Sequence, residues 1–468
     1  MNSEKHFKTI VIGAGPGGED CARLLSSSGH STALVNDAPL PGGECLWRGC
    51  IPSKIWRATA DRIRDSRRNA EFALVSAEAP ALDWKALQDF RRRLQEERGA
   101  LALKTDASAK INYIEGRARF TAPGTLEVSG ESYSFDTAVI AVGAPPFLPP
   151  VEGLKEALEK SRASTSDSVW DLEAVPQRLA VLGAGAIGIE MAQIFADFGS
   201  RVRVYEILDR ILPEMEKEIS SKLEEALREE AGLEIRTSCP LQKIEVREDH
   251  LILHSDSDTQ EVDHLILATG KRPDFAKLGL ESLGLDSVGT FLTTDKSCRT
   301  SVEGIYAVGD VSGGRMLAHS ASREGRVAAR NILGEHCEYD PDLDGGVIFS
   351  RPQVASFGLS LAEAKERGIA AGEMKLPLSV DAMAAIHREK HGLIKMLASE
   401  EDGRILGVHL LAEHADTLVG EAVALVTAGV TVYQLSEAVH PHPTQTELFG
   451  EMAQRLAQRF RRRRKGDS

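Results

Sequence analysis

Two cysteines, Cys45 and Cys50, stand five positions apart in a stretch whose residues could do redox chemistry, Gly-Gly-Glu-Cys-Leu-Trp-Arg-Gly-Cys-Ile-Pro-Ser-Lys at positions 42–54. In a regular helix this separation gives a rise of about 7.5 Å and a rotation of about 140°, too far apart for a disulfide. Glycines can bend the segment, and Lys54, four residues after Cys50, then shares a helix face with that sulfur. The spacing predicts a redox-active dithiol beside a cation. A structural disulfide and two unrelated thiols are the alternatives, and zinc is disfavoured because no second Cys or His pair follows at ligand spacing.

Two glycine-rich turns in the chain share one pattern. Residues 9–18 combine a short apolar run with Gly-Ala-Gly-Pro-Gly-Gly, and residues 179–188 combine a second run with Gly-Ala-Gly-Ala-Ile-Gly. A strand, a G-x-G-x-x-G turn and a helix in this order let the backbone approach a pyrophosphate at the helix N-terminus. Because the unit occurs twice with the same spacing, chance is a poor explanation, and we expect two dinucleotide sites.

The residue that ends the second strand of each unit should contact a ribose. It is Asn36 in the first unit and Glu206 in the second, each 23 positions after the first glycine. A carboxylate at Glu206 can accept bonds from both ribose hydroxyls and repels a 2′-phosphate, which predicts NAD rather than NADP. Arg210 counts against this, although we expect it to face solvent. Asn36 lacks the charge, so we expect a weaker hold on its ribose than a carboxylate would give, and the neighbouring Asp37 should face the other way.

Length and composition indicate an ordinary globular protein of about three domains, with 468 residues, 42% hydrophobic and 27% charged. The net charge of −14 argues against a nucleic-acid partner, and no run of residues suggests a membrane span. The N-terminus is too polar for a signal peptide and the six cysteines form no secreted framework, so we expect a cytoplasmic location. The basic segment 459–465 is interpreted as a solvated terminus.

The dithiol stretch resembles the active-site loop of the class I flavin disulfide reductases, the pyridine nucleotide-disulfide oxidoreductases, and among them most resembles the dihydrolipoamide dehydrogenases. The resemblance covers nearly the whole chain. Two departures lie in the loop itself: most members have Thr where Glu44 stands and commonly Asn-Val where Trp47 and Arg48 stand.

The resemblance implies an α/β fold with two Rossmann-like domains, one for FAD and one for NAD, followed by an α+β dimerisation domain. The expected boundaries are 1–150 for the first part of the FAD-binding domain, 151–271 for the NAD-binding domain, 272–340 for the second part of the FAD-binding or central domain, and 341–468 for the interface domain. Two further patterns concern the first part: residues 56–68 and 84–103 suggest helices with basic outer faces, and residues 111–135 alternate like antiparallel strands.

The resemblance also implies a base from the interface domain. The family pattern His-Pro-Thr-x-x-Glu is matched at His442 and Glu447, which implies that His442 is the catalytic base, oriented by Glu447 and donated to the dithiol of the other subunit, with a cis bond before Pro443. Glu190 matches the family position that pairs with Lys54. By themselves, a histidine between prolines suggests a rigid loop residue and Glu190 a surface helix residue.

The remaining expectations concern the cofactors. The FAD-binding candidates are Gly13, Gly15, Pro16, Gly18, Asn36, Asp37, Gly43, Glu44, Lys54, Gly143, Asp310, Leu317, Ala318 and His319. The NAD-binding candidates are Gly183, Gly185, Ile187, Gly188, Glu206 and Gly270. The catalytic candidates are Cys45, Cys50, Lys54, Glu190, His442 and Glu447, and no metal is expected.

The function that this implies is that of a homodimeric flavoprotein that couples NAD(H) to a dithiol and disulfide pair, most like dihydrolipoamide dehydrogenase, with a small disulfide or a lipoyl-carrying protein as substrate. Reduction of another small disulfide or of mercuric ion by NADH is an alternative, since the departures at positions 44, 47 and 48 fall at the cleft. A redox-sensing flavoprotein with weak turnover is the alternative of another class.

Overall fold

The structure of the chain is a computed structural model that describes residues 5–75, 80–256, 258–285, 287–288 and 290–464. It contains two compact units, each assembled from segments that are distant in the sequence. The first unit comprises residues 1–149, 164–174 and 269–340, and the second comprises residues 150–163, 175–268 and 341–468. Within the described residues, none of the helices is both long and apolar enough to cross a membrane.

The first unit is built on a seven-stranded sheet. Its strands are β1 (Lys5–Ile12), β2 (Thr32–Asn36), β3 (Asn112–Glu115), β4 (Ala118–Ala122), β5 (Thr125–Val128), β6 (Glu131–Ile140) and β17 (Ile305–Ala307). The order is β3-β2-β1-β6-β5-β4, and β17 pairs in parallel with the C-terminal half of β6. β3 also pairs in parallel, with β2, so the antiparallel expectation for 111–135 holds only from β4 onward. Short strands β15 (Ser287–Val288) and β16 (Phe291–Leu292) form a separate pair.

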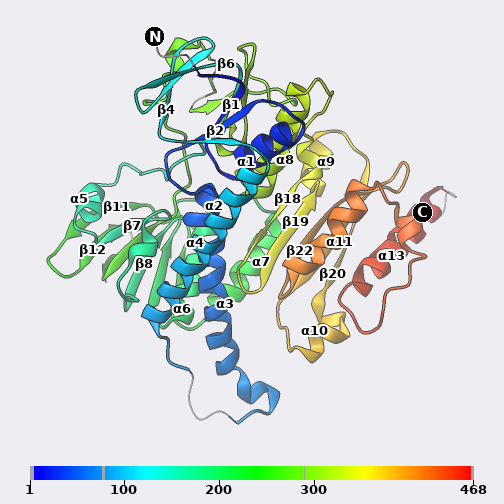
Figure 1. Ribbon diagram of the computed structural model, residues 1–468. Helices are drawn as coiled ribbons and strands as arrows, with labels where there is room; N and C mark the ends of the chain where they lie inside the picture. The colour runs from blue at the N-terminus through cyan, green and yellow to red at the C-terminus, as the bar shows by residue number, and fades with distance from the viewer. Residues whose placement is uncertain (1–4, 76–79, 257, 286, 289, 465–468) are drawn as a thin grey trace. The chain divides into compact units, whose positions relative to one another are not determined.

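The helices of the first unit include two that lie side by side, α1 (Pro16–Ser27) and α8 (Ala318–Ile332) (Figure 1). A Cβ atom on Gly325 would lie 2.1 Å from the Gly17 carbonyl oxygen, so only glycine permits this approach of the two backbones. The others are α2 (Gly43–Trp47), α3 (Cys50–Arg67) and α4 (Trp84–Ser108), with 3₁₀ turns at Asn69–Phe72, Val169–Asp171, Leu280–Ser282 and Gly309–Ser312.

The second unit begins with a five-stranded sheet of order β10-β9-β8-β14-β7, in which β10, β9, β8 and β14 pair in parallel. Its strands are β7 (Ala163–Thr165), β8 (Arg178–Leu182), β9 (Arg201–Tyr205), β10 (Leu233–Arg236) and β14 (His264–Leu267). The helices of this part are α5 (Leu154–Glu159), α6 (Ala186–Asp197) and α7 (Lys217–Arg228). A three-stranded antiparallel sheet accompanies them, made of β11 (Leu241–Val246), β12 (Leu251–Ser255) and β13 (Thr259–Val262).

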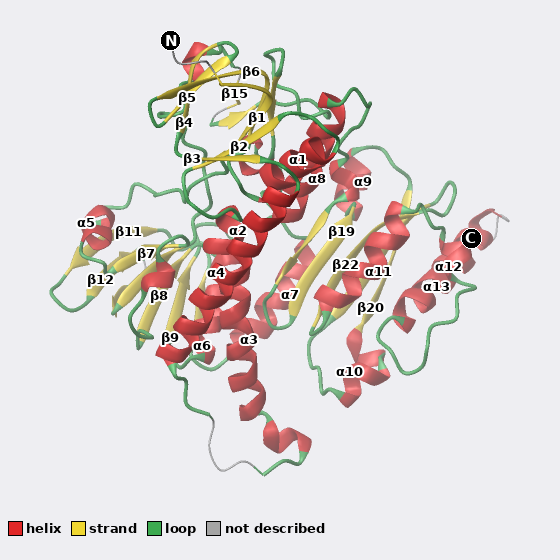
Figure 2. Cartoon of the chain, in the orientation of Figure 1, coloured by secondary structure: helices red, strands yellow, loops and turns green. Residues whose placement is uncertain are grey.

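The C-terminal part of the second unit is an antiparallel sheet of order β18-β19-β22-β21-β20. Three of its strands, β19, β22 and β20, are labelled in Figure 2. Its strands are β18 (Gly345–Ile348), β19 (Gln353–Gly358), β20 (Ala371–Pro377), β21 (Leu393–Ser399) and β22 (Ile405–Ala412). Its helices are α9 (Leu361–Glu366), α10 (Ala382–Ile386), α11 (Ala415–Thr427), α12 (Val432–Leu435) and α13 (Glu447–Arg464). α11 packs on β19 and β22, and α13 on β20 and β21, around the buried side chains of Met396, Phe449 and Phe460. The expected fold class, two parallel Rossmann-like sheets and a C-terminal α+β part, is confirmed.

Candidate active site

The first glycine turn has the geometry of a dinucleotide cradle. Gly13 has φ of 106°, and a Cβ on Gly18 would lie 1.9 Å from the Gly13 carbonyl oxygen, so both positions require glycine. Gly15 caps α1 and Pro16 occupies its first turn, where proline removes no hydrogen bond. The bare backbone and the helix N-terminus fit a pyrophosphate, so this chain has the donor set that FAD needs here.

The second glycine turn shares the backbone features of the first. Gly183 has φ of 104°, and a Cβ on Gly188 would again lie 1.9 Å from the carbonyl oxygen of the first glycine. Gly185 caps α6, which places Ile187 in its first turn. Glu206 is buried, with Oε2 accepting from Ala184 N at 2.7 Å and Oε1 from Leu208 N at 2.8 Å. The carboxylate is therefore fixed beside the turn.

One other side chain, that of Arg210, bears on the choice between NAD and NADP. Arg210 donates to the carbonyl oxygens of Pro213 and Met215, which turns its guanidinium toward its own loop. This differs from the solvent-facing position that we expected, and it likewise leaves no arginine prepared for a 2′-phosphate at this point of the chain. Gly270, with φ of 88°, follows β14 as expected. The arrangement favours NAD.

Asn36 stands where Glu206 stands in the second unit, but its amide has a different set of partners. Oδ1 accepts from Ala14 N at 3.3 Å, which matches the bond from Ala184 N to Glu206. Nδ2 donates to Ala38 O at 3.0 Å and to Tyr113 Oη at 2.9 Å. This revises our expectation that a carboxylate would serve better at position 36, because a carboxylate cannot donate to a carbonyl oxygen.

The dithiol loop is docked onto the first glycine turn. Gly42 N donates to Ala14 O at 2.8 Å, and a Cβ on Gly43 would lie 2.5 Å from the Gly15 Cα. Gly42 and Gly43 both have positive φ, which gives the bend predicted from the sequence. Since the same turn is the expected FAD cradle, the loop lies beside the place where that cofactor would bind.

The two thiols meet at the junction of α2 and α3. Cys45 lies in α2 and Cys50 begins α3, and their side chains are hydrogen-bonded to each other. This bond and burial raise the pKa of the Cys45 thiol, while the positive charge of Lys54 acts in the opposite direction. The structure thus brings Cys45, Cys50 and Lys54 together as the spacing predicted. Their catalytic roles stay predictions.

Glu44 forms an ion pair that the sequence did not reveal. Its carboxylate contacts the ammonium group of Lys271, whose side chain is only 11% exposed. Burial lowers the pKa of Lys271 and raises that of Asp310, and each charge opposes the shift of the other. Three charges therefore gather beside the dithiol loop. The only hint of Lys271 in the sequence was that it follows Gly270.

Further FAD candidates lie in the same unit. Leu317 caps α8, and Ala318 and His319 begin it. Gly143 has φ of 68° and follows β6. Asp37 is half-exposed, and its Oδ2 lies 3.4 Å from Arg117 Nε. These placements are compatible with the predicted contacts, which remain predictions.

In the second unit, His442 and Glu447 form the predicted pair. His442 Nδ1 lies 3.1 Å from Glu447 Oε1, and the peptide bond before Pro443 is cis. Because a carboxylate only accepts, Nδ1 donates to Glu447, and in the neutral ring Nε2 is then the acceptor nitrogen. The backbone N–H of Thr444 and the His442 ring lower the pKa of Glu447, which keeps it ionised. The His442 side chain is 74% exposed in the single chain.

Glu190 is placed differently from the surface position that its pattern alone suggested. It is buried in α6, and its Oε1 accepts from Phe349 N at 2.9 Å. Lys54 belongs to the other unit, so the expected pairing of these two residues stays a prediction. Among the described residues, no cluster of three or more His, Cys, Asp or Glu side chains is arranged to hold a metal ion.

Comparisons with known proteins agree with this geometry. The sequence model of the pyridine nucleotide-disulphide oxidoreductase family matches residues 7–325 of this chain. The sequence model of the dimerisation domain of the same family matches residues 345–453. The dihydrolipoyl dehydrogenase of Bacillus subtilis (strain 168) is 32% identical over 95% of both chains, and that of Thermus scotoductus is 34% identical over 97% of this chain and 98% of the relative.

Two solved structures share the architecture. LpdA from Mycobacterium tuberculosis is 25% identical with a TM-score of 0.87, over 96% of this chain and 99% of its own. The HOCl-induced flavoprotein disulfide reductase RclA from Escherichia coli, at 24% identity, shares the fold with a TM-score of 0.83 over the same shares of the two chains. The family resemblance is confirmed: this chain is an FAD- and NAD(H)-dependent enzyme of the pyridine nucleotide-disulphide oxidoreductase family.

Proposed function

We propose that the enzyme couples NAD(H) to the interconversion of a dithiol and a disulfide, with lipoyl groups carried on a protein as the natural substrate. The observation that carries the proposal is the hydrogen-bonded pair Cys45 and Cys50 in a loop docked onto the first glycine turn. The relatives named dihydrolipoyl dehydrogenase, similar over nearly the whole chain, support the choice of substrate. A cytoplasmic location belongs to the same proposal, since thiols stay reduced there.

The thiol chemistry requires a base, a nucleophile and a stabilised leaving group. In the oxidising direction, His442 Nε2 takes a proton from one substrate thiol, and the thiolate attacks the Cys45 sulfur of the oxidised pair. The Cys45–Cys50 bond breaks and Cys50 leaves as a thiolate beside Lys54. The second substrate thiol then attacks the mixed disulfide, which releases the substrate disulfide and leaves two electrons on the enzyme dithiol.

The remaining residues hold the partners of this exchange. Bound FAD supplies the means to pass an electron pair between the dithiol and the nicotinamide. Glu206, with both oxygens fixed by backbone N–H groups, selects NAD(H) by binding the ribose hydroxyls. Glu447 keeps the proton on His442 Nδ1 and stabilises the ring when it becomes charged.

The chain carries a dimerisation domain over residues 345–453, which supports a homodimer. We propose that His442 acts on the dithiol of the partner subunit, as the family resemblance implies. Mixing His442→Gln chains with Cys45→Ser chains tests this, because a heterodimer then has one site with both defects and one with neither. Activity near half the wild-type value per heterodimer supports the shared site. Inactive heterodimers of confirmed composition would mean that base and dithiol belong to one chain.

Steady-state oxidation of NADH with a panel of disulfides tests the substrate. Lipoamide and a lipoylated carrier domain should give the highest kcat/KM, above glutathione disulfide and cystine. Mercuric ion belongs in the panel because position 44 departs from the family pattern. A preference for another disulfide or for the metal would replace the lipoyl assignment, and absent turnover with intact FAD would favour a sensing role.

A further inference from the structure

Three successive carbonyl groups of the dithiol loop are held by buried side-chain donors from outside the loop. Gln95 Nε2 donates to Leu46 O at 2.7 Å and to Trp47 O at 2.9 Å. Trp170 Nε1 donates to Arg48 O at 2.9 Å. The loop between the two cysteines is therefore fixed through its backbone, and the donors come from segments far away in the sequence.

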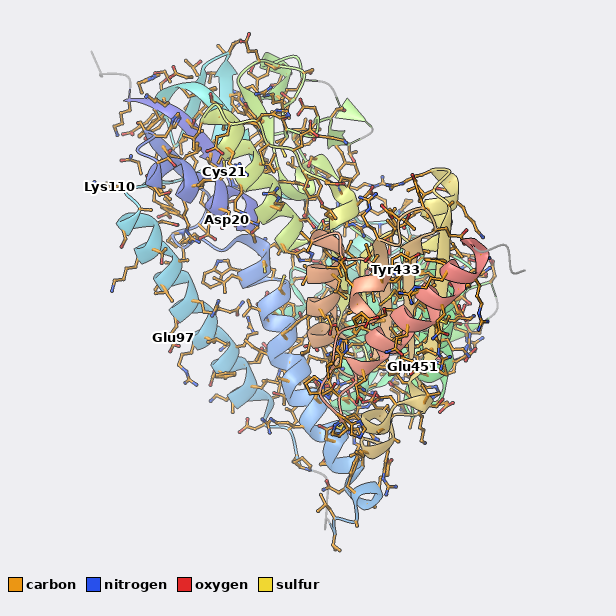
Figure 3. All side chains as sticks on the ribbon, turned by 90° about the vertical axis from the view of Figure 1, so that its right-hand side faces the viewer. Asp20, Cys21, Glu97, Lys110, Tyr433 and Glu451 are labelled. Carbon is orange, nitrogen blue, oxygen red and sulfur yellow. The ribbon has the colours of Figure 1, made fainter. Side chains whose placement is uncertain are left out.

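The amide of Gln95 is itself oriented by a buried guanidinium. Arg91 Nη1 donates to Gln95 Oε1 at 2.8 Å, which turns the NH₂ group of the amide toward the loop. Arg91 also donates to Gln88 Oε1 at 2.8 Å and to Trp170 O at 3.2 Å, so it joins both donors. We expected the basic residues of this helix on its outer face, but Arg91 is buried. Glu97, two residues beyond Gln95, lies on the exposed side of α4 (Figure 3).

Two further contacts position the indole ring of Trp170. Its ring packs against that of Trp56 with a centroid distance of 4.6 Å, and Nε1 also donates to Ser166 O at 2.9 Å. The ring of Trp47 fills the space opposite Gly99 of α4, where a Cβ would lie 2.6 Å from it. The two departures from the family pattern therefore lie against the segments that carry the donors. Trp47 contacts α4, the helix that contains Gln95, and Arg48 forms an ion pair at 3.3 Å with Asp167, three residues before Trp170.

We propose that Gln95 and Trp170 are positioning residues for the dithiol, which keep Cys45 and Cys50 adjacent when they are reduced and so favour their closure to a disulfide. A disulfide constrains a short loop by itself, whereas a dithiol does not. Donors outside the loop therefore have their larger effect in the reduced state. They hold the reduced loop in one conformation, so less conformational entropy is lost when the disulfide forms. The proposal rests on the proposed redox role of the pair.

The equilibrium of the holoenzyme with a glutathione redox buffer measures this effect. Oxidation of the dithiol by one glutathione disulfide forms the Cys45–Cys50 bond and yields two glutathione molecules, so electrons and protons balance. Alkylation of thiols after acid quenching, followed by mass spectrometry of the peptide that contains both cysteines, gives the oxidised fraction. Gln95→Met removes both donors with little change in volume.

Gln95→Met should lower the equilibrium constant for oxidation about tenfold, which corresponds to ~30 mV for a two-electron couple. Trp170→Phe keeps the ring contact with Trp56 but removes one donor, so it should shift the constant in the same direction by less. Should Gln95→Met fail to fold, Trp170→Phe still decides the sign.

Gln193→Met is the matched control. This amide is also buried, and it bonds to the backbone of Arg351 at 2.8 and 3.0 Å in the other unit. It should lower the melting temperature without moving the equilibrium constant. An unchanged constant in Gln95→Met and Trp170→Phe would overturn the proposal. Failure of the redox role itself would look different, because the wild-type pair would then not form a disulfide at any buffer ratio.

Discussion

Replacing Glu206 by glutamine separates the two tasks of this side chain. Each carboxylate oxygen accepts from one backbone N–H group, Oε2 from Ala184 and Oε1 from Leu208, and the residue is 7% exposed. Glutamine has the same size but a single oxygen. One of the two N–H groups would therefore face an NH₂ group and lose its acceptor.

The magnitude follows from these two bonds. A buried donor without an acceptor costs ~1–3 kcal/mol of unfolding free energy. The ribose hydroxyls lose one bond to a charged acceptor, worth ~1.5–3 kcal/mol, so the Kd for NAD should rise about 10- to 100-fold. The affinity for NADP should fall by less, because the repulsion between the carboxylate and a 2′-phosphate disappears. The ratio of the affinities for NAD and NADP should therefore decrease.

The assays are urea unfolding for stability and titration calorimetry of the oxidised enzyme with NAD and NADP for binding. Glu261→Gln is the matched control, since Glu261 lies in the same unit, is 58% exposed and pairs with Arg178 at 3.1 Å. A surface pair of this kind contributes ~0–1 kcal/mol, so both properties should stay near the wild-type values. If Glu206→Gln behaved like this control, the assignment of the second site to NAD through Glu206 would be refuted.

Three further predictions concern the other charges and amides of the site. His442→Gln should slow thiol oxidation severely and leave reduction of the bound flavin by NADH nearly unchanged in stopped-flow traces; equal loss of both would contradict a base role. Because the charge of Lys271 counteracts the burial that raises the pKa of Asp310, Lys271→Met should raise that pKa further, and acid release of FAD, followed by fluorescence, should begin at higher pH. Glu44→Gln should move the onset of FAD release to lower pH, because the charge of Lys271 is then no longer shared with Glu44 and stabilises the Asp310 carboxylate more strongly. Shifts of both variants to higher pH would instead indicate a general loss of stability. Asn36→Asp should lower the urea midpoint and speed FAD release. The wild-type amide donates to the carbonyl oxygens of Ala38 and Leu40, and a carboxylate cannot make these bonds. Slower release would contradict this reasoning.

The parts of the site that depend on local backbone chemistry could be predicted from the amino-acid sequence. Gly13 and Gly183 were recognisable because a turn with positive φ and a close approach requires glycine wherever it occurs. The bend between Cys45 and Cys50 followed from helix geometry, because five residues of regular helix would separate the thiols. The pairing of His442 with Glu447 lies within six consecutive residues and so depended little on the remaining fold.

The distant side chains that support these parts could not be predicted from the sequence, because folding alone brings them together. Arg91 belongs to a helix with many basic residues, and hydrophobic periodicity does not tell which polar side chain is buried among partners. The pairing of Glu44 with Lys271 joins residues more than two hundred positions apart, so neither position reveals the other. Asn36 is a further example. The sequence pattern showed its position at the end of a strand, but it did not show that the amide donates to a backbone carbonyl oxygen, because the loop conformation that brings this group close forms only in the folded chain.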